Sequence, residues 1–291
     1  MIMKYLLLLF TITISIAQTE DNSVRDYYKY DFNDFESLEM ELNFGLGELN
    51  IHPNDKPKIV SGTIEYNPNH TEIDIDFNSN NKKASLSISG EIADFECCDD
   101  GFSFDNFEFN DKTHNMMDFK LATGIPTELE LGFGLGEAYI NLTDMSLSYF
   151  ELDCGLSDVK LELESSNKIS CERVSISSGL GDFNGYGLGN INTRKFNFDV
   201  GLGSATIDLR GKFQEDMDLS IDVGLGSLEL ILPKNVNIKL RVDYSFLSSV
   251  DVDGLMSNGM NKYISREWID DRPTIIGNIS VGLGSIDVEI D

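Results

Sequence analysis

Apolar and polar residues alternate along most of this chain, and short glycine-containing triplets interrupt the alternation at regular intervals. Alternation with period two is typical of strands that bury one face. The first glycines of the central triplets lie 21 to 24 residues apart, which is the period of solenoids. The pattern predicts an all-β solenoid of short strands in which each coil carries one triplet. The seven triplets are Gly45-Leu46-Gly47, Gly134-Leu135-Gly136, Gly155-Leu156-Ser157, Gly179-Leu180-Gly181, Gly201-Leu202-Gly203, Gly224-Leu225-Gly226 and Gly282-Leu283-Gly284.

The aligned repeats predict which side chains form the core. We expect the residue before each triplet, and the residue two positions earlier, to face inward. The second, fourth and sixth residues after a triplet, such as Leu228, Leu230 and Leu232, should face inward as well. The first two columns are Phe44, Phe133, Cys154, Ser178, Val200, Val223 and Val281, and Leu42, Leu131, Leu152, Ile176, Phe198, Ile221 and Ile279.

The central leucine is the same in all seven triplets. The glycines around it give the backbone freedom for a corner or a bulge. We expect the leucines to stack rung on rung inside the coil, where each contributes roughly 1.5 to 3 kcal/mol if it is fully buried. The coils should then stabilise one another by stacking.

The start of the chain is typical of a secretory signal. Residues 1–4 form a short charged start, residues 5–16 are apolar, and Ser15-Ile16-Ala17 fits a small-x-small cleavage site. We expect export and cleavage after Ala17, with no membrane span in the mature chain. The sequence divides into a signal peptide (1–17), an N-terminal β region with the first Gly-Leu-Gly coil and an acidic aromatic segment (18–120), and a C-terminal β-solenoid (121–291).

The chain is strongly acidic, with 50 Asp and Glu against 22 Lys and Arg and a formal net charge of −28. Such a field argues against binding to nucleic acid or to an anionic membrane surface. Many acids occupy the outward positions of expected strands, which is the solvated face. We expect no metal and no cofactor: no acidic ladder follows the triplets, and His52, His70 and His114 lie far apart.

Four cysteines allow three disulfide pairings in an oxidising compartment. The pairing that we favour is Cys154 with Cys171, because we place both on neighbouring strands of one coil. The adjacent Cys97 and Cys98 could form a vicinal disulfide, join another chain or bind metal. Zinc is disfavoured because the spacing lacks the paired short loops of a tetrahedral site.

Two segments interrupt the repeat and carry the candidate contact residues. Binding surfaces of solenoids lie where the repeat is interrupted. One interpretation is that their aromatic residues cap the ends of the solenoid; the other is that they bind a partner. The candidates are Phe102, Phe104, Phe107 and Phe109 in the first interruption and Tyr263 and Trp268 in the second.

The sequence does not indicate an enzyme. Gly179-Leu180-Gly181 with Gly185 has the spacing of a dinucleotide loop, but a strand-like run follows it instead of a helix. There is no nucleophile elbow, no phosphate loop and no pair of metal-binding histidines.

The first triplet with its flanks, Phe44–Ile51, and the last, Ile279–Val288, are similar to toast-rack β-solenoid domains of bacterial cell-envelope proteins. These include the C-terminal domain of LiaF-like cell-wall-active antibiotic response proteins and adhesin-like head domains. The resemblance covers residues 35–290 and implies a non-enzymatic envelope module. Unlike the LiaF-like proteins, this chain has no run of several transmembrane helices before the solenoid, and the resemblance carries over no binding residue.

We therefore expect an exported scaffold or interaction module of the periplasm or cell surface, with a role in envelope-stress regulation as its more specific form. The alternative is an adhesin-like protein that binds a glycan or a protein. A polysaccharide-active enzyme is the third class.

Overall fold

The computed structural model describes residues 17–18, 24–31, 35–55, 58–92 and 115–291. All of their strands belong to one sheet. A short 3-10 helix, η3, spans Leu188–Ile191. The strands are β1 (Ala17–Gln18), β2 (Val24–Asp31), β3 (Ser37–Asn54), β4 (Lys58–Tyr66), β5 (Thr71–Asn80), β6 (Lys83–Ile92), β7 (Met116–Ala122), β8 (Pro126–Asn141), β9 (Ser146–Glu162), β10 (Val174–Tyr186), β11 (Lys195–Asp208), β12 (Met217–Leu232), β13 (Asn237–Tyr244), β14 (Ser249–Val252), β15 (Leu255–Ser257), β16 (Lys262–Ser265) and β17 (Thr274–Ile290).

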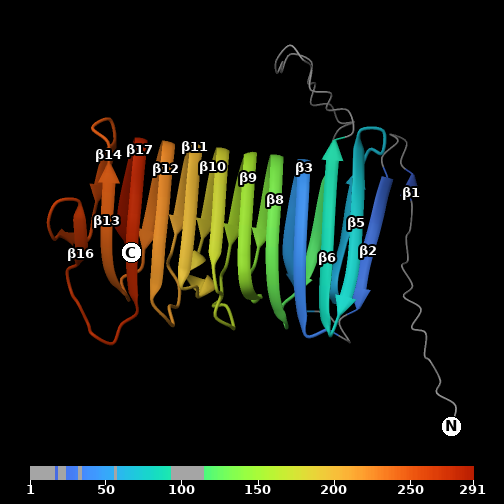
Figure 1. Cartoon of the computed structure of the whole chain (residues 1–291), viewed down its shortest axis with the longest axis horizontal. Helices are drawn as coiled ribbons and strands as arrows, with labels where there is room; N and C mark the ends of the chain where they lie inside the picture. The colour runs from blue at the N-terminus through green and yellow to red at the C-terminus, as the bar shows by residue number, and fades with distance from the viewer. Residues whose placement is uncertain (1–16, 19–23, 32–34, 56–57, 93–114) are drawn as a thin grey trace, which may run out of the picture.

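The seven strands that carry triplets lie side by side and parallel, in the order β3, β8, β9, β10, β11, β12, β17 (Figure 1). Their register places each triplet opposite the next. Leu202, for example, stands opposite Leu180 on one side and Leu225 on the other. The all-β solenoid predicted from the sequence is confirmed.

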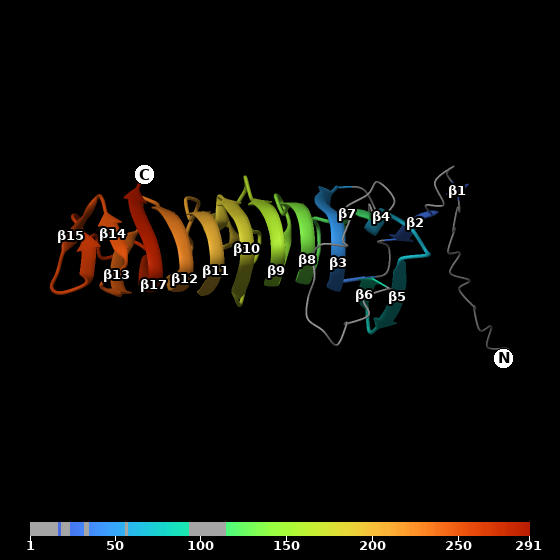
Figure 2. The ribbon, with the colours of Figure 1, turned by 90° about the horizontal axis from the view of Figure 1, so that it is seen from above.

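Each of these strands bows around the core, as Figure 2 shows from above. The columns predicted to face inward are buried, from Leu42 and Phe44 on β3 to Ile279 and Val281 on β17. The parts of the strands before and after the triplets pack against each other across the core. Phe183 follows its triplet and Phe198 precedes the next one, and their ring centroids lie 5.1 Å apart. One folded sheet thus encloses the core between its two halves.

The two interruptions of the repeat supply the end rungs. At the C-terminal end, β13 and β14 both pair with β17, so β17 lies between β12 and β13 (Figure 1). At the N-terminal end, β6 and β7 pair with the first and second parts of β3 in the same way. Each end rung is split where the other rungs have their triplet. The irregular spacing in the sequence therefore reflects two end rungs of the parallel stack that are made from two strands each. Antiparallel strands continue the sheet beyond them, β5, β4 and β2 at the N-terminal end and β16 and β15 at the C-terminal end.

The prediction of a buried leucine column is wrong. Leu46 is buried and Leu135 is half-buried, but the other five central leucines are 40% to 47% exposed. The reason is a change of phase at the triplet. The residue before it and the second residue after it both face inward, although they are five positions apart, as Val200 and Ala205 show. Strict alternation cannot hold across an odd separation, and the strand bends there with the leucine on its outer side.

The prediction of a Cys154–Cys171 disulfide is also wrong, since both are free and buried. Cys154 stands opposite Ser178 of β10, whereas Cys171 precedes that strand and bridges to Thr193. Cys171 lies before Val174, where β10 begins, and the four extended steps from Val174 to Ser178 already span roughly 13 Å at 3.3 Å per residue. Burial raises the pKa of each thiol to about 12, so both side chains are neutral parts of the core. Cys97 and Cys98 lie outside the described residues.

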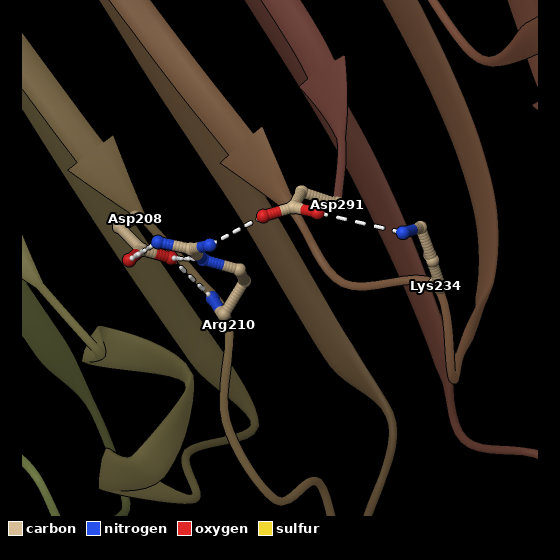
Figure 3. Close-up of polar contacts among 4 residues, drawn as sticks. All are labelled: Asp208, Arg210, Lys234 and Asp291. Carbon is tan, nitrogen blue, oxygen red and sulfur yellow. Dashed lines mark hydrogen bonds and ion pairs between the residues drawn. The ribbon is translucent and has the colours of Figure 1, made fainter.

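A charged network ties the ends of three rungs together (Figure 3). The Arg210 guanidinium donates to both carboxylate oxygens of the buried Asp208, over 2.9 and 2.8 Å, and also to Asp291 after β17. Lys234, after β12, reaches the other carboxylate oxygen of Asp291 at 3.4 Å. These contacts fix the edge of the solenoid at the C-terminal ends of β11, β12 and β17.

Candidate functional site

The column of central leucines runs through the whole stack and is exposed from Leu156 to Leu283, whereas Leu46 at its N-terminal end is buried. We call Leu46, Leu135, Leu156, Leu180, Leu202, Leu225 and Leu283 the leucine ladder. Rungs in a sheet are about 4.8 Å apart, so the six steps of the ladder span roughly 29 Å. Exposed leucines are ordinary when they are scattered singly. A straight row of them across stacked strands forms a continuous apolar stripe instead.

The glycines of the triplets are required by the close stacking of the rungs. A Cβ atom on Gly155, Gly179, Gly201, Gly224 or Gly282 would lie 2.5 to 2.9 Å from the carbonyl oxygen of the glycine on the preceding rung. Real Cβ atoms essentially never approach an oxygen so closely. The leucine is therefore the one large side chain that each triplet displays, and it lies between two glycines in every triplet except Gly155-Leu156-Ser157.

The N-terminal part of the ladder borders an open hollow of about 830 Å³. Leu135, Leu156 and Leu180 line it together with glycines of their triplets, and the end of β6, residues 89–91, bounds it. This volume is within the range of sites for small ligands.

Acidic side chains flank the ladder on both sides. They occupy the second and fourth positions before the triplet and the first and third positions after it, and all are exposed or half-buried. At these positions on the seven strands, Lys160 is the one basic residue. The acids before the triplet, called the upstream rim, are Glu41, Glu130, Glu151, Asp153, Asp199 and Asp222; those after it, called the downstream rim, are Glu48, Glu137, Asp158, Asp182, Glu229 and Asp287.

Burial and neighbouring carboxylates raise the pKa of two acids in the upstream rim. Burial raises the pKa of Glu130, and the charges of Glu151 and Glu41 on the adjoining strands add to this effect. The pKa of Asp199 is raised by burial and then by the charge of Asp222. Because like charges disfavour ionisation, the neighbouring carboxylates of the upstream rim repel one another. A positively charged ligand would relieve that repulsion.

The C-terminal end of the stripe carries two strongly exposed apolar residues. Phe246 is 94% and Leu247 is 62% exposed. Their loop, residues 245–248, joins β13 to β14 and stands opposite the last triplet. Ser245 and Ser248 anchor it, because their hydroxyl groups donate to the carbonyl oxygen of Gly282 over 2.6 and 3.0 Å. The split end rung thus extends the leucine ladder by one more apolar step.

The aromatic candidates predicted from the sequence do not lie on the ladder in the described part of the chain. Tyr263 on β16 stands opposite Leu240 and packs partly against the core. Trp268 is 38% exposed, and the Nζ atom of Lys239 lies 4.5 Å from the centroid of its indole ring system. A partner-binding role for these two residues stays a prediction. The other four, Phe102, Phe104, Phe107 and Phe109, lie outside the described residues.

A second, smaller site lies after the triplets on β3, β8 and β9. This polar hollow of about 260 Å³ is lined by Tyr139, Lys160 and several amides and carboxylates. The Nζ atom of Lys160 lies 5.1 Å from the centroid of the Tyr139 ring and 2.8 Å from a carboxylate oxygen of Glu162. His52 packs against the same ring, with centroids 5.5 Å apart. The lysine of this site is already paired.

No group of three or more His, Cys, Asp or Glu residues in the described ranges could hold a metal ion. No helix in those ranges is long and apolar enough to cross a membrane.

Comparisons with known proteins concern mainly the fold. Residues 16–184 match the family described as the N-terminal domain of toast_rack, DUF2154. No curated protein matches the chain. Among solved structures, a candidate cell adhesion protein from Clostridium sporogenes is 20% identical, with a TM-score of 0.45 over 92% of this chain and 99% of its own. A candidate adhesin from Parabacteroides distasonis is 13% identical, with a TM-score of 0.32 over 91% and 93%.

Proposed function

This chain belongs to the toast-rack family, and from that premise we propose that it is a non-enzymatic interaction module of the cell envelope. The observation that supports this proposal best is the leucine ladder. It offers a regular apolar surface on a rigid stack of strands, and apolar stripes of this extent are typical of sites that bind macromolecules. A scaffold that holds a partner needs no more than such a surface.

The proposal includes export. The mature chain would begin at Gln18 and act in the periplasm or at the cell surface, with the N-terminal β region ending near residue 120 and the solenoid following it. A role in envelope-stress regulation is the more specific form of the proposal. It requires that the partner on the ladder belong to a sensor system.

Photo-crosslinking in the native cells tests this proposal. A photoreactive amino acid in place of Leu202 should give a discrete adduct with another macromolecule, because this position lies in the middle of the ladder. The matched control places the photoreactive amino acid at Asp218. This residue lies on β12, the strand that pairs with β11, and away from the triplet, so it should give no adduct. Equal adducts at both positions, or no adduct at Leu202, would contradict the proposal.

A second candidate function is an adhesin-like protein that binds a glycan, which the polar hollow beside Tyr139 favours. Sugars bind through amide and carboxylate hydrogen bonds and through contacts with aromatic rings, and Asn50, Asn184 and Tyr139 supply such groups. On a glycan array, Tyr139→Ala should then lose binding while Leu202→Ser retains it. The reverse result would favour the ladder.

A further inference from the structure

We propose that the leucine ladder binds an amphipathic helix of a protein partner, and that lysine and arginine flank the apolar stripe of this helix. The inference rests on the proposed function and adds the chemistry of the partner. The spacing of the rungs, the length of the stripe and the charge of its two rims support it.

The spacing of the ladder fits a helix that lies across the strands. Neighbouring rungs are about 4.8 Å apart, and an α-helix rises about 5.4 Å per turn. An apolar side chain on each turn therefore stays close to one rung over several turns. The side chains on one face of an extended peptide are about 6.6 Å apart. If such a peptide lay along the ladder, its side chains would no longer match the leucines after two rungs.

The length of the stripe sets the length of the helix. Five steps separate Leu135 from Leu283, which is about 24 Å or about 16 helical residues. Phe246 and Leu247 project at the C-terminal end of the stripe, where an apolar residue of the partner can be anchored. A free helix of this length is marginally stable in water, so we expect the segment to gain helix on binding or to belong to a folded partner.

The charge of the rims selects a basic partner. The upstream and downstream rims place carboxylates on both sides of the leucines, and a helix with basic residues on both flanks of its apolar stripe would face both rims. A second copy of this chain would instead bring equal acidic rims together, and the chain carries a net charge of −28. An anionic lipid surface would be repelled for the same reason. The rims therefore favour a basic helix over either of these occupants.

A direct binding experiment tests this inference with a model peptide. The probe is a synthetic peptide of about 16 residues, blocked at both ends, with leucine along one helical stripe and lysine elsewhere. It is titrated into the complete mature chain and followed by fluorescence anisotropy. We expect saturable binding, a gain of helical circular dichroism, and at least tenfold weaker binding of a peptide that has glutamate in place of every lysine. A third peptide, with serine in place of leucine, should not bind.

Two sets of variants locate the binding on the protein. Asp153→Asn, Asp199→Asn and Asp222→Asn together should weaken the lysine peptide roughly tenfold and flatten the dependence of its affinity on salt. The matched control removes three exposed charges from the loop after β16, with Glu267→Gln, Asp270→Asn and Asp271→Asn, and should leave the affinity unchanged. Serine at Leu180, Leu202 and Leu225 together should abolish binding, with melting curves to show that the chain remains folded.

Four results would overturn the inference. These are equal binding of the lysine and glutamate peptides, equal effects of the rim and control variants, a parent dimer in ultracentrifugation that the ladder variant dissociates, and tighter binding to phosphatidylglycerol vesicles than to the lysine peptide. The proposed function is tested separately, because crosslinking at Leu202 does not depend on the charge of the partner. An adduct at Leu202 without peptide selectivity would reject only the basic helix.

Discussion

Truncation of one leucine in the ladder and of one leucine in the core tests whether the ladder is exposed or buried. Leu202 and Leu230 lie on neighbouring strands, β11 and β12. Leu230 is fully buried, whereas Leu202 is 43% exposed. We predict that Leu230→Ala lowers the free energy of unfolding by about 2 to 5 kcal/mol, because it loses burial and leaves a cavity.

The expected cost of Leu202→Ala is smaller for two reasons. A leucine loses three carbons on truncation to alanine, and complete burial is worth about 0.8 kcal/mol for each. Only about half of the Leu202 side chain is buried, and truncation at an open surface leaves no cavity, so we expect a loss of about 1 kcal/mol.

Thermal melting followed by circular dichroism compares the two variants with the parent. A loss of 1 kcal/mol lowers the melting temperature by roughly 2 to 4 °C in a chain of this size, and Leu230→Ala should lower it at least twice as far. Equal shifts would mean that the leucine column lies inside the coil. They would refute both the ladder and the proposals that depend on it.

Three further predictions concern the charged network, the thiols and export. Arg210→Ala takes the guanidinium from the buried carboxylate that it holds in Figure 3 and should cost about 2 kcal/mol in urea unfolding. Arg241→Ala breaks an exposed pair with Asp243, also two residues along the chain, and should leave the urea midpoint nearly unchanged. In a variant without the two cysteines of segment 93–114, Cys154 and Cys171 should both react with a thiol reagent in denaturant without reductant. Labelling of the native protein should stay slow even at pH 9, because this pH is below their pKa of about 12. An intact disulfide between them would contradict the prediction. The intact mass of the protein from its native envelope should correspond to cleavage after Ala17, and a mass that retains residues 1–17 would contradict export with cleavage.

The fold could be predicted from the sequence because its two signals are local. Period-two alternation identifies strands and the repeat aligns them, so the inward columns from Leu42 to Ile279 are those that the structure buries. The end rungs could not be predicted in the same way, since β13 and β14 are joined by a loop where other rungs have a triplet. The pairing of Cys154 with Cys171 failed because nearness along the chain does not give the level of a residue within a rung.

The site was missed although part of its signal is in the sequence. Val200 and Ala205 both belong to predicted core columns and are five positions apart. The alternation must therefore change phase between them, and the central leucine belongs with one flank or with neither. Sequence alone does not decide this, because the bend depends on how closely the glycine backbones stack. Once the bend is known, the leucine lies on its outer side.

The outward direction of the leucines is itself an argument for binding. The fold needs the glycines of the triplet, which the carbonyl oxygens of the neighbouring rungs require, but it gains little from an apolar side chain that is half exposed. Duplication of an ancestral rung does not explain the column either, because the neighbouring outward position two before the triplet has diverged to Asn43, Gly132, Asp153 and Ser177. A leucine that stays the same on all seven rungs, and is exposed on the last five, while its outward neighbours vary supports the proposal that this part of the column is a binding surface.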